Sequence, residues 1–210
     1  MSVTKLLAIS LGAILTNNFI FSQFLGICPF LGVSKKSDTA VGMGLAVTFV
    51  MGLASAFCYG VNIILVKLGL DYMQTVAFIL VVASLVQFIE MFLKKSMPTL
   101  YTALGVYLPL ITTNCCVLGV TILAVQDYTK VYEAQGFGMA YAEALICAAG
   151  AGVGFLVAML LFCGVRQRVE RSNPPESFKG LPITLVSAAI TAMSFMGFGG
   201  LVENIIAALM

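Results

Sequence analysis

The sequence contains no histidine, and only 10% of its 210 residues are charged. Without histidine, the chain alone offers no imidazole for a proton relay or for binding zinc or haem iron. Hydrophobic residues, in contrast, make up 60% of the sequence, and its mean hydropathy is +1.06. Such a chain cannot cover itself with a water-exposed surface. These two shortages exclude several enzyme classes and indicate a protein that lies in lipid.

Basic residues are few as well, and their arrangement does not suit nucleic acid. The formal net charge is +2, and the lysines and arginines form short clusters between apolar runs, without interleaved aromatic residues. We therefore expect no nucleic-acid partner.

Charge-poor apolar runs recur along the chain. A transmembrane helix needs about 20 mostly apolar residues, and six such runs lie near 5–27, 40–66, 72–93, 101–125, 137–164 and 181–207. The first run is followed by Pro29 and then Lys35 and Lys36, without a small-residue cleavage site, so we expect it to be retained. The sequence predicts one all-α integral membrane domain, residues 1–210, with six transmembrane helices.

Lysine and arginine gather in alternate connections between these runs. Of the eleven basic residues, only Lys5, Lys67 and Lys130 lie outside the first, third and fifth connections. Because positively charged connections stay on the cytoplasmic side, the asymmetry predicts that both termini lie outside. A re-entrant run, which would change the parity, is the alternative.

Two segments, 28–33 and 115–120, share cysteine, leucine, glycine and valine at matching offsets. Each lies in the first of three spans, so halves 1–95 and 96–210 would cross the membrane in opposite senses, as an inverted 3+3 repeat. Proline and polar residues interrupt the first and fourth spans, which predicts broken helices there. Broken helices at equivalent places mark a buried site. Chance similarity between common span residues is the alternative.

Cys28 and Cys115 are the candidate metal ligands. A thiolate at the start of a half-helix faces free amide donors and the positive end of the helix dipole. Cys28 directly precedes Pro29, which predicts Cys28 as a helix cap, and Cys115 is its equivalent. Adjacent side chains point in different directions, so only one of Cys115 and Cys116 should be a ligand. The repeat selects Cys115 and leaves Cys116 as the second choice. Two cysteines cannot complete a four-thiolate iron–sulfur cluster, so a partner subunit is implied.

The remaining cysteines, Cys58, Cys147 and Cys163, lie in apolar runs without breaks or polar neighbours, and we expect them to pack as small buried residues. Three glycine runs are also explained by packing. They lie at 42–44, 150–154 and 197–200, lack a following Lys-Ser or Lys-Thr, and predict closely packed helices.

Intramembrane carboxylates are functional candidates by default. Glu90, late in the third span, and Glu143, early in the fifth, form a candidate ion path together with Thr113 and Asn114. The alternative is that Glu90 pairs with Lys94 one helical turn later and that Glu143 reaches the outer interface.

Four segments resemble a known family: 17–19, 24–36, 108–115 and 195–202. They look like the membrane subunits of Rnf-type ion-pumping ferredoxin:NAD oxidoreductases, with the A-type branch as the best match, over essentially the whole chain. The related NqrE-type subunit of sodium-pumping NADH:quinone oxidoreductase is the alternative within this family. Asn17-Asn18 and Cys28-Pro29 are more similar to the Rnf type.

The resemblance implies a six-helix subunit that pairs with its inverted paralogue, the E subunit, the two holding one [2Fe-2S] cluster near the middle of the membrane. Cys28 and Cys115 are then its ligands from this chain. This chain would be a relay as electrons pass from ferredoxin to NAD through flavin and iron–sulfur centres of neighbouring subunits, coupled to Na⁺ or H⁺ transport across a bacterial or archaeal cytoplasmic membrane. The implied partners are the B, C, D, E and G subunits. Cys116 departs from the family pattern, because relatives commonly carry a small residue such as alanine there.

A stand-alone secondary transporter is the alternative from another class of protein, because carriers also use inverted repeats and broken helices. The cysteines would then be incidental. A carrier should tolerate Cys28→Ser and Cys115→Ser, whereas a cluster ligand should not. A structural membrane anchor would need neither the cysteines nor the breaks.

Overall fold

The regular structure of the chain is helical throughout the part that the structure describes. The computed structural model describes residues 10–16, 18–34, 37–96, 111, 114–135, 137–172, 174–197, 200 and 204. These residues contain α-helices and short 3₁₀ and π turns and no strand. The predicted all-α class is confirmed.

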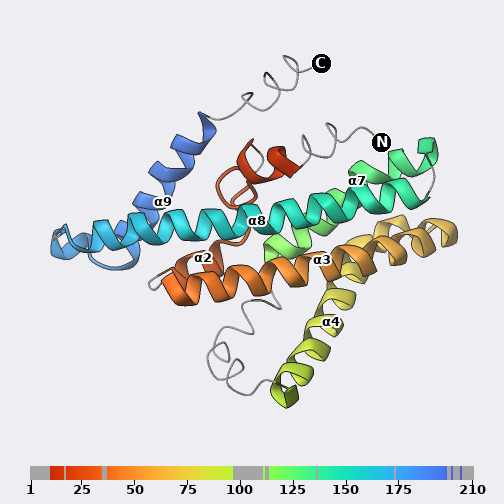
Figure 1. The fold of residues 1–210 in the computed structure, drawn as a ribbon, viewed down its shortest axis with the longest axis horizontal. Helices are drawn as coiled ribbons and strands as arrows, with labels where there is room; N and C mark the ends of the chain where they lie inside the picture. The colour runs from red at the N-terminus through yellow and green to blue at the C-terminus, as the bar shows by residue number, and fades with distance from the viewer. Residues whose placement is uncertain are drawn as a thin grey trace.

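Four long helices make up most of the molecule: α3 (Ser37–Leu68), α4 (Gln74–Ser96), α7 (Cys115–Gln135) and α8 (Phe137–Glu170). Two shorter helices are α2 (Ile27–Val33) and α9 (Leu181–Met196). Single turns are η1 (Gly12–Thr16), η2 (Asp71–Met73) and η3 (Glu176–Phe178). In Figure 1, α3 and α8 lie side by side along the long axis, and α4 and α9 diverge from them in opposite directions.

Three helices among the described residues are long and apolar enough to cross a membrane: Ser37–Leu68, Gln74–Met91 and Ala140–Glu170. Two shorter apolar helices are Cys115–Gln126 and Leu181–Met196. These five overlap the second to sixth predicted runs, and residues 101–110, 112 and 113 of the fourth run lie outside the described residues. The first run, 5–27, is not a continuous helix where the structure describes it.

Glycines bring α3 and α8 into close antiparallel contact. A Cβ built on Gly152 would lie 2.6 Å from Cγ2 and 2.9 Å from Cα of Thr48. On α3, a Cβ on Gly44 would lie 3.2 Å from Cα of Leu156. Close helix packing at Gly44 and Gly152 agrees with the prediction. At Gly42, by contrast, nothing lies within 4 Å of a Cβ built on the backbone.

The segment around η1, near the start of the described residues, packs against the same glycine run of α8. A Cβ on Gly150 would lie 3.3 Å from Cα of Ser10, and one on Gly154 would lie 3.0 Å from the carbonyl oxygen of Ala13. Glycines on α8 therefore pack against two different segments, α3 and the segment around η1. Without side chains at these positions, the segments approach α8 at backbone distance.

Large apolar side chains on the outer faces of the helices are exposed. Those more than half exposed include Phe49, Phe57, Leu80, Phe88 and Ile190. In water each would leave apolar surface unburied, at about 25 cal/mol for each Å². Lipid removes this cost, so the exposed faces agree with the membrane location that composition predicts.

The close approach of α3 and α8 can be tested with one methyl group. Gly152→Ala should lower the stability of the purified protein by about 1–3 kcal/mol, because the new Cβ meets the backbone of Thr48. Gly164→Ala, on the same helix with nothing within 4 Å of the added atom, is the matched control. The measurement is the thermal unfolding midpoint in detergent. Equal midpoints for the two variants would contradict the packing.

Candidate functional site

The first span is interrupted by a non-helical segment, residues 18–26, held by a buried asparagine. The Nδ2 of Asn18 donates hydrogen bonds to the carbonyl oxygens of Gly154, at 2.9 Å, and Ile14, at 3.1 Å. Its Oδ1 accepts a hydrogen bond from the backbone N–H of Ile20 at 3.1 Å. The side chain thus binds backbone groups on three sides, and the predicted break in the first helix is confirmed.

The chain becomes helical again at Ile27, and Gly26 is the N-cap of α2, with φ 84° and ψ 22°. The prediction that Cys28 is the cap is therefore wrong, because Cys28 is the second residue of the helix and Pro29 the third. The turn occurs at Gly26 because glycine adopts left-handed angles without steric cost. Proline is tolerated at the third position because the N–H groups of the first turn have no partner inside the helix.

The two cysteine segments lie against each other although they are far apart in sequence. The backbone N–H of Gly26 donates a hydrogen bond to Sγ of Cys115 at 2.9 Å. A Cβ on Gly26 would lie 2.9 Å from Cε2 of Phe155 and 3.0 Å from Cβ of Cys116. No larger residue fits at Gly26 without displacing these neighbours. Cys28 is only two residues further along α2, so the structure brings both predicted ligand segments to one place.

The second cysteine segment also begins a helix. Cys115 is the first residue of α7, and Asn114, 4% exposed, precedes it in non-helical backbone. The Oδ1 of Asn114 accepts a hydrogen bond from the N–H of Cys116 at 3.0 Å, as an N-cap residue does. Among the described residues, Nδ2 of Asn114 has no hydrogen-bond partner. The remainder of the predicted break, including Thr113, lies outside the described residues.

Exposure separates the six cysteines. Cys28 and Cys115 are exposed, whereas Cys116 is fully buried beside them. Cys58 and Cys163 are also buried, and Cys147 is half-buried, which agrees with packing roles. In the described ranges no cluster of three or more cysteine or acidic residues could hold a metal ion. Cys28 and Cys115 are thus two accessible thiols in adjoining segments.

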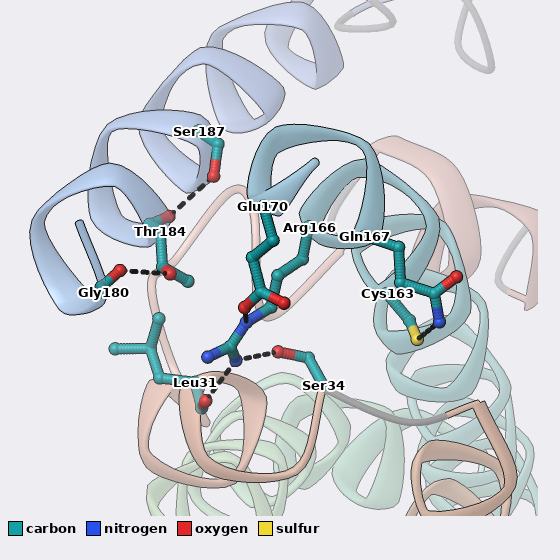
Figure 2. A network of polar contacts seen from close by, with 9 residues as sticks. All are labelled: Leu31, Ser34, Cys163, Arg166, Gln167, Glu170, Gly180, Thr184 and Ser187. Atoms are coloured by element: carbon teal, nitrogen blue, oxygen red, sulfur yellow. Dashed lines mark hydrogen bonds and ion pairs between the residues drawn. The ribbon is translucent and has the colours of Figure 1, made fainter. Parts of the chain in front are cut away.

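An arginine near the end of α8 contacts the opposite, C-terminal end of the helix that carries Cys28. Arg166 of α8 is 7% exposed, and Figure 2 shows its side chain directed at the C-terminal end of α2. Its Nη1 donates hydrogen bonds to the carbonyl oxygen of Leu31, at 2.6 Å, and to Oγ of Ser34, at 2.7 Å. Its Nε forms an ion pair with Glu170 at 3.0 Å.

This role of Arg166 was missed by the sequence reasoning, which counted it only among the basic residues of a connection. The pairing with Glu170 follows a four-residue helical spacing and could have been found from the sequence. The contacts with Leu31 and Ser34 could not, because more than 130 residues separate them from Arg166.

The two candidate carboxylates differ in their surroundings. Glu143 is 1% exposed on α8, between the buried Ala140 and Ala144. Glu90 is half-buried on α4, one turn before the exposed Lys94. Both lie on helices long and apolar enough to cross a membrane. Of the two, Glu143 lies inside the protein.

Comparison with known proteins identifies close relatives. Residues 6–202 match the family model described as Rnf-Nqr subunit, membrane protein. The chain is 52% identical, over 93% of its length and 97% of the relative's, to the A-type subunit of the Na⁺-translocating ferredoxin:NAD⁺ oxidoreductase complex of Acetobacterium woodii. It is 50% identical to the A-type subunit of the ion-translocating oxidoreductase complex of Syntrophotalea carbinolica, over 95% of this chain and 99% of the relative. A third relative, the A-type subunit of the ion-translocating oxidoreductase complex of Vibrio cholerae, is 45% identical over 96% of this chain and 91% of the relative.

The difference in exposure between the adjacent cysteines predicts a difference in reactivity. In variants that keep only Cys115 or only Cys116, N-ethylmaleimide should alkylate Cys115 faster by about tenfold or more, because a buried thiol reacts only after local opening. The rates are measured by mass spectrometry in the folded protein. After denaturation the two should converge, and similar rates before denaturation would contradict the burial of Cys116.

Proposed function

This chain belongs to the Rnf-Nqr family of membrane subunits, and from that membership we propose that it is the A-type subunit of an ion-translocating ferredoxin:NAD⁺ oxidoreductase. It is a part of a larger complex, as the names of its relatives state for those proteins. Its partners are the B, C, D, E and G subunits, with the paralogous E subunit closest. The chain relays electrons and holds no complete substrate site.

One observation carries the proposal of an electron relay. The N–H of Gly26 donates a hydrogen bond to Sγ of Cys115, so the segment of Cys28 meets that of Cys115. Both thiols are exposed. We infer that they are two ligands of a [2Fe-2S] cluster whose other two ligands come from the E subunit. Such a cluster accepts and releases one electron at a time, which is the chemistry it supplies when bound.

The residues around the thiols suit this task. Each cysteine lies in the first turn of a helix, where backbone N–H groups have no partner inside the helix. The N–H of Gly26 already donates to the sulfur of Cys115 and would stabilise a negative charge on it. Because Cys116 is fully buried, we propose it as a neighbour of the cluster and not as one of its ligands.

The arrangement of basic residues supports an orientation in the cytoplasmic membrane of a bacterium or archaeon. The bond between Arg166 and Ser34 brings the connection before α3 next to the C-terminal end of α8. These are two of the three basic connections, so they lie on one face of the membrane. Since that face is cytoplasmic under the positive-inside rule, both termini lie outside.

We propose that Glu143 is the principal carboxylate of the path for the coupled ion, Na⁺ or H⁺. Its 1% exposure places a group that can carry charge inside the protein, where a cation or proton lowers the cost of burial. Asn114, buried beside the cysteines, adds an oxygen and an amide near the redox centre. Glu90 and Thr113 are further members of this proposed path.

The names of the relatives favour an oxidoreductase component over a stand-alone transporter, because each name places its protein in an oxidoreductase complex. The one that states its substrates names ferredoxin and NAD⁺, not quinone. A carrier that does not use thiols also leaves unexplained the contact between two segments that each carry an exposed cysteine.

The cluster proposal is tested by electron paramagnetic resonance and iron analysis on the purified complex. Cys28→Ser and Cys115→Ser should each abolish one [2Fe-2S] signal, because each removes a ligand. Cys116→Ser should keep that signal, since its side chain is fully buried away from the exposed pair. Other iron–sulfur signals of the complex serve as internal standards for assembly.

A folded complex that keeps every [2Fe-2S] signal in the Cys28→Ser and Cys115→Ser variants would overturn the relay. A loss of signal in Cys116→Ser with retention in Cys115→Ser would transfer the ligand role to Cys116.

The ion-path proposal is tested by separating transport from electron flow. Glu143→Gln removes the charge with little change of shape and should lower ion transport per electron by about tenfold or more, about 1.4 kcal/mol. The cluster signal should be retained. Glu176→Gln, at an exposed carboxylate of η3, is the control. The measurement is ²²Na⁺ uptake or proton uptake in proteoliposomes, relative to NAD⁺ reduction. Unchanged transport per electron would exclude Glu143 from the path.

A further inference from the structure

The short helix α2 carries Cys28 and depends on outside contacts for its position. It has seven residues, and isolated helices of fewer than about 12 residues are not stable in water. At its N-terminal end, Gly26 bonds to Cys115. On its side, the ring of Phe30 stacks on that of Phe162 of α8, with centroids 4.2 Å apart.

The C-terminal end of α2 is held by Arg166. Leu31 is among the last four residues of the helix, whose carbonyl groups have no partner within it. Nη1 of Arg166 donates to the Leu31 carbonyl at 2.6 Å and to Oγ of Ser34 at 2.7 Å. A guanidinium also stabilises the negative end of the helix dipole. Arg166 therefore pairs with one of these carbonyl groups and connects this end of α2 to α8, while the carbonyl of Val33 accepts a hydrogen bond from Oγ1 of Thr39 at 3.3 Å.

The ion pair between Nε of Arg166 and Glu170 fixes the guanidinium in this orientation. Since Glu170 is half-exposed and belongs to the same helix, it orients the arginine without linking α8 to another element. Nη1 remains for α2. Lysine cannot reproduce this arrangement, because it has a single charged nitrogen in place of a planar fork.

A displacement of Leu31 would also displace Cys28, because both belong to the short helix α2. The two residues are three positions apart in one helix, which corresponds to about 4.5 Å along the axis. We propose that Arg166 is the positioning residue for Cys28, fixing α2 from its C-terminal end so that the thiolate meets the cluster at the required place. This inference rests on the proposed function of Cys28 as a cluster ligand.

The experiment uses the complete complex with Arg166→Gln, Arg166→Lys and Ser34→Ala. Arg168→Gln is the matched control, because Arg168 is exposed two residues away on the same helix. For each complex we would measure iron content, the line shape of the [2Fe-2S] signal that depends on Cys28, and its midpoint potential in a redox titration. These properties report on the cluster and do not require turnover.

Arg166→Gln should broaden the signal, shift its midpoint potential and reduce iron content, because the C-terminal end of α2 loses two hydrogen bonds to α8. Arg166→Lys should restore iron content in part but not the native line shape. Ser34→Ala, which removes one of the two bonds that Arg166 makes to this end of α2, should shift the potential in the same direction by less. Arg168→Gln should match the wild type.

The outcomes distinguish this inference from the function on which it rests. If the wild-type complex has no Cys28-dependent [2Fe-2S] signal, the proposed function fails. If that signal is present and keeps its iron, line shape and potential in all three variants, only the positioning role of Arg166 fails. Should Arg166→Gln prevent assembly, Arg166→Lys and Ser34→Ala decide, and native signals in both would overturn the positioning role.

Discussion

A helix that breaks inside an apolar protein must find partners for the backbone groups that it no longer pairs, and this requirement governs how the site is built. Asn18 supplies partners at the start of the break, by binding the carbonyls of Ile14 and Gly154 and the N–H of Ile20. At the other end, the N–H of Gly26 is paired with a sulfur from the second half of the chain. Each unpaired group would cost several kcal/mol in lipid. The hydrogen bond from Gly26 to Cys115 thus does two things: it pairs a backbone group of the break, and it joins the two cysteine segments.

Helix α8 is the common support of these contacts. Its glycines at 150, 152 and 154 accept the first segment and α3 at backbone distance, and Phe155 limits the space at Gly26. Its far end carries Arg166. The C-terminal end of α2 is thereby fixed to α8, and its N-terminal end is bonded to the first residue of α7.

Much of this could be predicted from sequence because the signals are local. Apolar runs of sufficient length, glycine runs and polar residues inside the first span each depend on a few neighbouring residues. The cap of α2 was predicted wrongly because Pro29 fits more than one position in the first turn, and only the turn at Gly26 decides between them. The contacts of Arg166 depend on the tertiary fold, since its partners on α2 lie far away in the sequence. For Cys115 and Cys116, burial distinguishes two side chains that the sequence could only rank.

The long separation between Arg166 and Leu31 has a consequence for biogenesis. The ribosome makes α2 first and reaches Arg166 135 residues later, which at about 5–20 residues per second is a delay on the order of ten seconds. During this interval α2 is in or at the membrane without the residue that binds its C-terminal end. The final position of α2 can therefore be set only after α8 has been made, late in the synthesis of the chain.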